Sequence, residues 1–307
     1  FYHSKRVEEF LVELYSQIRS NSAFVVVFGE EGSGKSMLSC KIVDDLKRLE
    51  NSAYIVQVDC LIPDWDVKDF LVAVLQKGGI NVENSISFHS MVEAWLVKLI
   101  ENKNIIRLLI VDNAHNLHSR NTLELLKTFN SLRIGKDKLI NVVLFAKPDW
   151  EIYLDELEDF RDLFTIKFNL EGFTLQEVRD FIRWRLVKCG YEELNGPILD
   201  ESAYRVVFAY TEGNPRKILK LLRNVFIELV SKGEKKVNSR LVLECIENKF
   251  HPSTSERVRI ARALLEYDLS EERREEINKL STKELEKWQR DIKSVEILLK
   301  EYEKEDI

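Results

Sequence analysis

The segment Gly29–Ser36, with the sequence GEEGSGKS, restricts the folds open to this chain of 307 residues more than any other feature. It fits the phosphate-binding loop pattern G-x-x-x-x-G-K-[ST], in which glycines let backbone N–H groups converge on an anion. The apolar run 23–28 before it predicts a buried strand, and residues 37–43 after it have apolar side chains at helical spacing. A strand, a glycine loop and a helix N-terminus in this order indicate a nucleoside triphosphate site, whereas an accidental glycine-rich turn lacks that context. In such a site Lys35 reaches the β- and γ-phosphates and Ser36 is a ligand of Mg²⁺.

Composition indicates a packed globular protein with room for two domains, or for one domain with an appended subdomain. Hydrophobic residues make up 45% of the chain and charged residues 32%. No apolar run is long enough to span a bilayer, and the cysteines lack CxxC or zinc spacing, so we expect reduced thiols and a cytoplasmic protein. His115 and His118 complete no metal site and are expected to be ordinary loop residues. The net charge of −6 disfavours a protein that coats nucleic acid along its whole surface. It is compatible with a local basic patch.

Strand and helix patterns alternate over the first part of the chain, which predicts a parallel sheet covered by helices on both faces. An amphipathic helix is expected within residues 1–22. The expected strands are Phe24–Phe28, Tyr54–Asp59, Ile106–Val111, Val142–Ala146 and Phe164–Leu170, and the helices between them are near Lys35–Leu49, Val67–Lys77, Ser90–Glu101 and Leu123–Leu132. Beyond Leu170 only helices are expected, at Thr174–Lys188, Glu201–Tyr210, Pro215–Ser231 and Ser239–Lys249. The predicted domains are therefore a nucleotide-binding core over 1–170, a helical lid over 171–251 and a charged helical tail over 252–307.

Three further segments suit a triphosphate site. The apolar strand before Asp112 delivers a carboxylate that could hold Mg²⁺, although Asp also commonly ends a strand at a turn. The next residue, Asn113, can hydrogen-bond a water but cannot accept its proton, which weakens the case for fast hydrolysis. Lys147 follows another buried strand and either approaches the γ-phosphate or is solvated. Arg216 follows an expected helix cap, Asn214-Pro215, and either contacts phosphate or lies free on the surface.

Together these residues resemble the AAA+ superfamily, and more closely the ExeA/GspA-like ATPases and the related TniB, TnsC and MuB-type regulators of transposition. LLIVDNAHNL, at 108–117, resembles the Walker B segment of that group except at Asn113. FAKPDW, at 145–150, resembles its sensor 1 segment, and Gly213–Arg216 its sensor 2 segment. The opening residues 1–4 resemble its first segment, which packs near the adenine. The resemblance covers about residues 1–250.

The resemblance implies a five-stranded AAA+ core, a helical lid, ATP with Mg²⁺ between them, and assembly into rings or filaments. It also implies an arginine that reaches the neighbouring subunit's γ-phosphate; Leu163 occupies its usual place, and Arg161 is the nearest basic candidate or else a surface ion-pair residue. The expected nucleotide-binding residues are Gly29, Glu31, Gly32, Ser33, Gly34, Lys35, Ser36, Met37 and Arg216. The expected catalytic residues are Asp112, Asn113, Lys147 and Arg161, and the expected metal ligands are Ser36 and Asp112.

The partner is left open by the sequence. A transposition-type regulator is expected to bind duplex DNA with a steep salt dependence, whereas a secretion-type ATPase is expected to need a membrane protein as its partner; the negative charge favours the latter. In the tail, an apolar a/d stripe follows a capping box and suits either a helix folded on the lid or a self-association or partner helix. The stripe consists of Leu285, Trp288, Ile292, Val295, Leu299 and Tyr302. Slow hydrolysis that controls assembly and a non-hydrolysing ATP-binding scaffold remain the two competing functions.

Overall fold

The computed structural model describes residues 2–49, 53–63, 65–82, 87–102, 105–135, 137–192 and 196–268, and the apolar stripe of the tail lies outside them. These residues form two compact units. The first unit contains His3–Glu171, and the second contains Tyr2 together with the chain from Gly172 onward.

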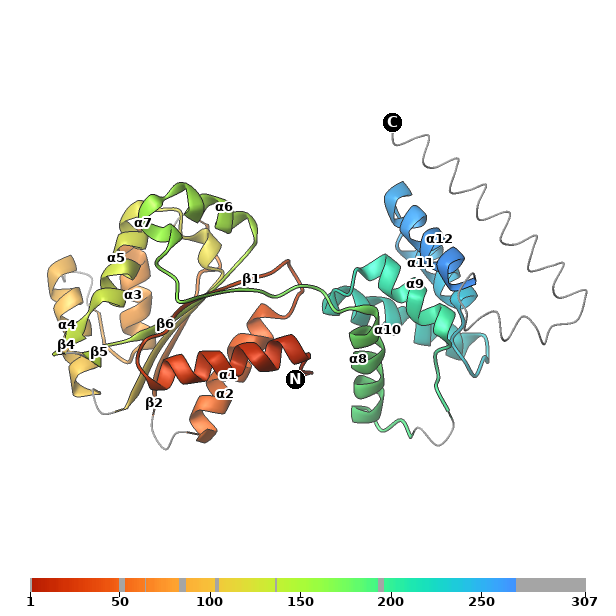
Figure 1. Ribbon diagram of the computed structural model, residues 1–307, viewed down its shortest axis with the longest axis horizontal. Coiled ribbons are helices and arrows are strands. Elements are labelled where there is room, and N and C mark those ends of the chain that lie inside the picture. The colour runs from red at the N-terminus through yellow and green to blue at the C-terminus, as the bar shows by residue number, and fades with distance from the viewer. Residues whose placement is uncertain are drawn as a thin grey trace, which may run out of the picture. The chain divides into compact units, whose positions relative to one another are not determined.

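The first unit alternates helices with strands (Figure 1). Its elements, in chain order, are α1 (Lys5–Arg19), β1 (Phe24–Phe28), α2 (Lys35–Leu49), β2 (Ala53–Asp59), α3 (Val67–Lys77), α4 (Phe88–Glu101), β3 (Ile106–Asp112), the 3₁₀ turn η1 (Ala114–Asn116), α5 (Arg120–Ser131), β4 (Arg133–Ile134), β5 (Asp137–Lys138), β6 (Asn141–Ala146), α6 (Asp149–Glu156), α7 (Glu158–Arg161) and β7 (Ile166–Asn169). Each of the five predicted strands is present, with bounds shifted by at most two residues at an end.

The main sheet of the first unit has five parallel strands in the order β2-β3-β6-β1-β7, which confirms the predicted architecture. Because side chains alternate across a strand, β1 sends Phe24, Val26 and Phe28 into one core and Val25 and Val27 into another. Helices α3 to α7 lie over the first face and α1 with α2 over the second, as Figure 1 shows. Burial on both faces explains why these strands are continuous apolar runs in the sequence.

Helix α1 begins where the side chain of Ser4 accepts a hydrogen bond from the backbone N–H of Val7. Its apolar stripe faces the sheet, with Leu14 and Ile18 fully buried. Two features were not predicted: the short antiparallel pair β4–β5, and the helices α6 and α7. Helix α6 buries only Trp150 and Leu154, which is too little periodicity to detect in eight residues.

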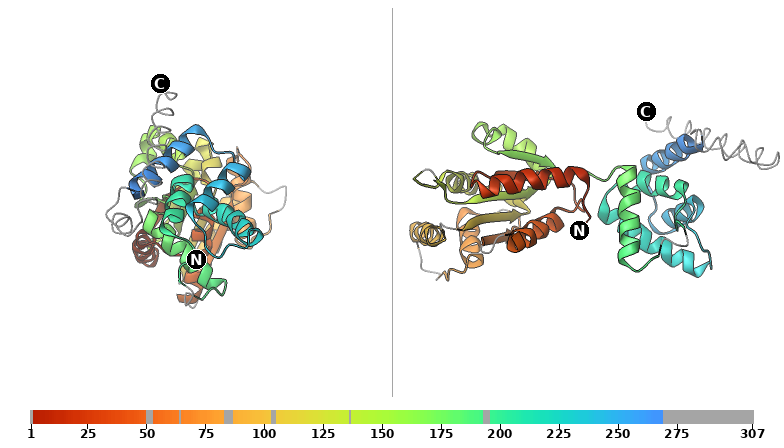
Figure 2. Two further views of the ribbon diagram at one scale, coloured as in Figure 1. Left: turned by 90° about the vertical axis from the view of Figure 1, so that its right-hand side faces the viewer. Right: turned by 60° about the horizontal axis from the view of Figure 1, so that its bottom comes forward.

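The second unit is a bundle of helices, seen from two further sides in Figure 2. Its helices are α8 (Leu175–Lys188), α9 (Glu201–Thr211), α10 (Pro215–Ser231), α11 (Ser239–Lys249) and α12 (Thr254–Asp268). Helix α9 packs against each of the other four, so α12 adds to this bundle although it lies in the predicted tail. None of the helices described in either unit has the length and apolarity needed to cross a membrane.

Two segments approach closely at the start of the second unit. The N–H of Phe173 donates to the carbonyl of Gly213 at 2.9 Å. A Cβ on Gly213 would lie 1.9 Å from the carbonyl oxygen of Phe173, and one on Gly172 would lie 2.2 Å from that of Glu212. Gly213 also has φ of +71°, so glycine is required there on two grounds. This contact fixes the turn that leads into α10.

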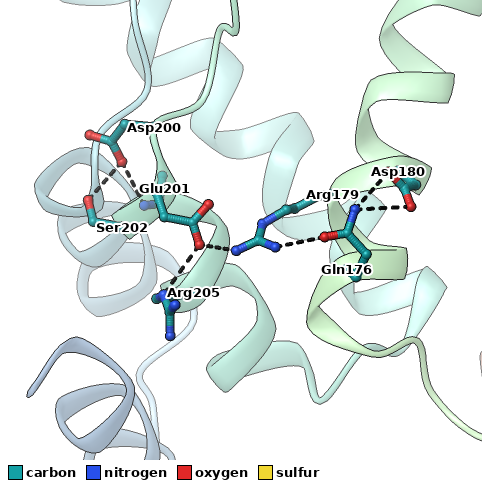
Figure 3. A network of polar contacts seen from close by, with 8 residues as sticks. Gln176, Arg179, Asp180, Asp200, Glu201, Ser202 and Arg205 are labelled. Carbon is teal, nitrogen blue, oxygen red and sulfur yellow. Dashed lines mark hydrogen bonds and ion pairs between the residues drawn. The ribbon is translucent and has the colours of Figure 1, made fainter. Parts of the chain in front are cut away.

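A polar network joins α8 and α9 (Figure 3). Glu201 accepts from Arg179 of α8 and forms an ion pair with Arg205 at 3.3 Å. The guanidinium of Arg205 in turn lies over the ring of Tyr267, 5.2 Å from its centroid. Arg179 also donates to Gln176 at 2.8 Å. The carboxylate of Glu201 therefore holds both Arg179 and Arg205 in place.

We expect Glu201→Ala to destabilise the second unit by about 2 kcal/mol, between the values for exposed and buried ion pairs. The side chain of Glu201 is 28% exposed and its loss leaves two partly buried guanidinium groups without their carboxylate. Hydrogen exchange of peptides from α8 and α9 in the full chain measures this directly. Asp180→Ala is the matched control because, among the described residues, its carboxylate accepts only from Gln176; equal protection loss in both variants would contradict the prediction.

Candidate functional site

The phosphate loop folds as its sequence predicts. Gly32 and Gly34 have φ of +84° and +108°, in the region where only glycine is unstrained. Gly29 is buried, and a Cβ on it would lie 2.6 Å from Ser33 Oγ and 2.9 Å from the carbonyl oxygen of Leu170. The loop therefore needs its glycines for two reasons, backbone conformation and close approach. It ends at Lys35, where α2 begins and presents backbone N–H groups that lack partners within the helix.

Lys35 is buried at the loop, with 9% of its surface exposed. Its ammonium donates to the carbonyl oxygens of Gly29 at 2.6 Å and Glu30 at 3.0 Å. Burial lowers the pKa of Lys35, and the positive charge of Lys147 lowers it further, while Asp112 has the opposite effect. A phosphate anion beside Lys35 would relieve both the burial and the repulsion.

Asp112 is the last residue of β3 and Lys147 directly follows β6; these neighbouring parallel strands end on the same edge as the phosphate loop. Their charges both act on Lys35, so the structure brings these three predicted residues together. Asp112 is 4% exposed, and its Oδ1 accepts from the backbone N–H of Asn113 at 2.9 Å. Lys147 is exposed. The arrangement can hold a polyanion between two cations, with a carboxylate near them.

His115 belongs to this cluster, which the sequence analysis missed. Burial lowers its pKa, and the charges of Lys147 and Lys35 add to that effect. Within the described residues, His115 Nδ1 and the hydroxyl of Ser33 are buried without a hydrogen-bond partner. Buried polar atoms of this kind are usually paired, so two of them at a phosphate loop indicate a site that hydrogen-bonds a ligand. The signal available in the sequence was that His115 follows Asp112 by three residues, just after the end of the strand.

The residues present fit Mg²⁺. Magnesium prefers oxygen ligands and usually keeps waters and substrate phosphates in its shell, so a protein site needs few side chains. The Ser36 hydroxyl in the first turn of α2 and the Asp112 carboxylate at the end of β3 are such oxygens. In the described part of the chain no group of three His, Cys, Asp or Glu residues could hold a metal without other ligands. A metal here would therefore depend on phosphate oxygens.

The remaining predicted residues are placed as follows. Glu31, within the loop, and Met37, in the first turn of α2, are both exposed. Arg216 lies in the first turn of α10, where Asn214 accepts from its backbone N–H at 3.1 Å and Pro215 occupies the first helical position, as predicted. Because Arg216 belongs to the second unit, its role at the phosphates stays a prediction. Arg161 is the last residue of α7, and its side chain lies outside what the structure describes.

Tyr2, in the opening segment of the chain, packs among aromatic rings of the second unit. Its ring centroid lies 5.4 Å from that of Phe173 and 5.6 Å from that of Phe181, in edge-to-face contacts. The expected place of this segment near an adenine remains a prediction.

The motifs, the strand order and the helical second unit define a class of protein: an AAA+ P-loop fold. Residues 18–154, which lie within the first unit, match a family model described as an AAA domain. The match spans the phosphate loop, β3 with Asp112, and Lys147.

Among individual proteins, the chain is 25% identical over 242 residues to the general secretion pathway protein A of Aeromonas hydrophila. That alignment covers 77% of this chain and 42% of the relative, so the chain spans about two fifths of the relative's length.

Solved structures agree on the fold. The Aeropyrum pernix ORC2 protein, in complexes with ADPNP and ADP, has a TM-score of 0.59 at 16% identity, over 86% of this chain and 74% of that one. The Thermotoga maritima RuvB Holliday junction branch migration motor has a TM-score of 0.53 at 17% identity, over 86% and 76%. The Drosophila ORC bound to DNA has a TM-score of 0.59 at 16% identity, over 83% and 62%.

Proposed function

We propose that this chain binds ATP with Mg²⁺ and hydrolyses it slowly, and that the bound nucleotide controls its assembly and its grip on a protein partner. The observation that carries the proposal is the phosphate loop, which contains Lys35 and lies on the same edge of the sheet as Asp112 and Lys147. The AAA domain match over 18–154 and the ADPNP and ADP complexes of the ORC2 protein support a nucleotide as the ligand.

Each residue has a distinct role in the proposal. The loop amides and Lys35 hold the β- and γ-phosphates, and Lys147 lies near the γ-phosphate. Ser36 and Asp112 hold Mg²⁺, which when bound neutralises phosphate charge and stabilises the developing charge on the leaving oxygen. Asn113, in the place of the usual glutamate, can orient a water without taking its proton, so turnover is slow.

The nucleotide state is read out by the second unit and by a neighbouring subunit. Arg216 contacts bound ATP and closes the helical lid; hydrolysis releases it. Arg161 is the candidate for the arginine that reaches a neighbour's γ-phosphate. In this proposal the partner is a protein, in keeping with the likeness to a protein of a general secretion pathway. The chain acts in the cytoplasm, where ATP is supplied.

The test combines turnover with assembly size for the full chain. We expect phosphate release from Mg-ATP below about 1 s⁻¹, at the low end of enzyme rates, and none from Lys35→Ala. Analytical ultracentrifugation should show larger assemblies with ATP or ADPNP than with ADP. Intact ATP recovered after long incubation would favour the non-hydrolysing scaffold, and one size under all conditions would remove nucleotide-controlled assembly.

Duplex DNA is the second candidate partner, because one face of α10 is basic and exposed. Arg216, Lys217, Lys220 and Arg223 lie on that helix. If DNA is the partner, binding should strengthen with ADPNP and fall steeply with salt. Titration of a labelled duplex at two salt concentrations separates it from a protein partner, which predicts no saturable binding.

A further inference from the structure

The side chain of Asn113 contacts the neighbouring strand β2. Its backbone is left-handed, with φ of +54°, a conformation that Asn tolerates better than most residues. Its side-chain Nδ2 donates to Oδ1 of Asp59 at 2.7 Å, a short charge-assisted hydrogen bond. At the position where many ATPases carry a glutamate, the Nδ2 group of this amide therefore donates to a carboxylate on β2.

Asp59 is the last residue of β2 and is paired in register with Asp112. Parallel strands lie about 4.8 Å apart, so its backbone lies directly beside that of Asp112. Its side chain is exposed and, within the described residues, forms no ion pair. The carboxylate of Asp59 thus lies at this edge of the sheet, one strand away from position 113, where many ATPases carry a glutamate.

The strand ends around Asp59 are held firmly. The N–H of Cys60 donates to the carbonyl oxygen of Asp112 at 3.0 Å, and Asn116 Nδ2 donates to the carbonyl oxygen of Cys60 at 2.6 Å. Burial raises the pKa of the Cys60 thiol to about 12, and the charges of Asp59 and Asp112 raise it in the same direction. Asp59 is therefore held in position by its neighbours.

We infer that Asp59 supplies the base that Asn113 cannot, with Asn113 as the positioning residue that aims it; the inference rests on the proposed function. Water oxygen forms a bond to the γ-phosphorus, and the bond from that phosphorus to the β–γ bridging oxygen breaks with its electron pair left on ADP. The water's proton passes to the Asp59 carboxylate and then to solvent.

The test is steady-state hydrolysis by the full chain with Asp59→Asn, which preserves shape and hydrogen-bonding capacity. We expect kcat to fall about a hundredfold, as for loss of a general base, while KM for Mg-ATP stays within about twofold. Asn113→Ala should lower kcat about tenfold at unchanged KM, because the base remains but is no longer aimed. The exchange variant Asp59→Asn/Asn113→Asp, which keeps the pair and the net charge, should recover most of the lost kcat. Asp44→Asn, an exposed carboxylate on α2, is the control for charge alone.

Three results would each count against the inference in a different way. Turnover of Asp59→Asn equal to wild type would overturn the role of Asp59 and leave the proposed ATPase intact. Recovery of kcat at high Mg²⁺ concentration would make Asp59 a metal ligand and not a base. Absence of any Lys35-dependent turnover in the wild-type chain would overturn the ATPase proposal and the inference with it; binding of a fluorescent ATP analogue to every variant shows that each is folded.

Discussion

Lys35→Ala is expected to weaken ATP binding about a hundredfold and to abolish hydrolysis. Hydrogen bonds to charged groups contribute about 1.5–3 kcal/mol, and each 1.4 kcal/mol is a tenfold change in affinity. Lys35 is nine-tenths buried at the loop, and both burial and Lys147 lower the pKa of its ammonium. Bound phosphate supplies the compensating charge, so the lysine interacts more favourably in the complex than in the free protein.

The measurement is equilibrium titration with a fluorescent ATP analogue, paired with thermal unfolding with and without nucleotide. Without nucleotide the variant should unfold at a temperature no lower than wild type, since removing a buried ammonium relieves its desolvation. With nucleotide the wild-type chain should gain stability by linkage and the variant should not. Lys47→Ala, an exposed lysine in the last turn of the same helix, is the matched control. An affinity within a few-fold of wild type in Lys35→Ala would contradict the prediction.

The sequence predicted elements that have strong periodicity. β1 and α2 have the predicted bounds because an uninterrupted apolar run and a glycine loop mark both ends. The same principle explains what was missed. β4 and β5 have two residues each, and α6 buries too few side chains to show a period. Helix α12 falls in the predicted tail because its charged composition conceals the few residues, such as Ile260 and Tyr267, that it buries.

The sequence predicts which residues stand at the ends of strands, but not which strands are neighbours in the sheet. The sequence alone shows that Asp112 ends a buried strand and that Lys147 follows another. Parallel strands bring such ends to one edge of the sheet. Which strand lies beside which depends on the order β2-β3-β6-β1-β7, which local patterns do not encode. Asp59 also ends a predicted strand, but its partnership with Asn113 depends on that order and on one left-handed residue.

Asp112→Asn is expected to have opposite effects on two measurements. Turnover with Mg-ATP should fall about a hundredfold or more, because the metal loses a protein ligand and phosphate charge is less well neutralised. Binding of ATP without Mg²⁺ should become tighter, since a carboxylate that acts on Lys35 no longer opposes the polyanion. Asn retains an oxygen that can accept from the backbone N–H of Asn113, so the turn after β3 should persist.

The two effects separate a metal ligand from a merely structural residue. A structural defect would weaken ATP binding with and without Mg²⁺, whereas loss of a ligand weakens only the metal-dependent part. Asp44→Asn changes the net charge equally on exposed surface and should leave both measurements near wild type. Titration of Mg²⁺ at fixed ATP completes the test, because the variant should need at least about tenfold more metal for half-maximal turnover, as expected for lost coordination. Unchanged metal dependence in Asp112→Asn would assign Mg²⁺ to other oxygens, and Asp59, paired with Asp112 across the strands, would be the first to examine.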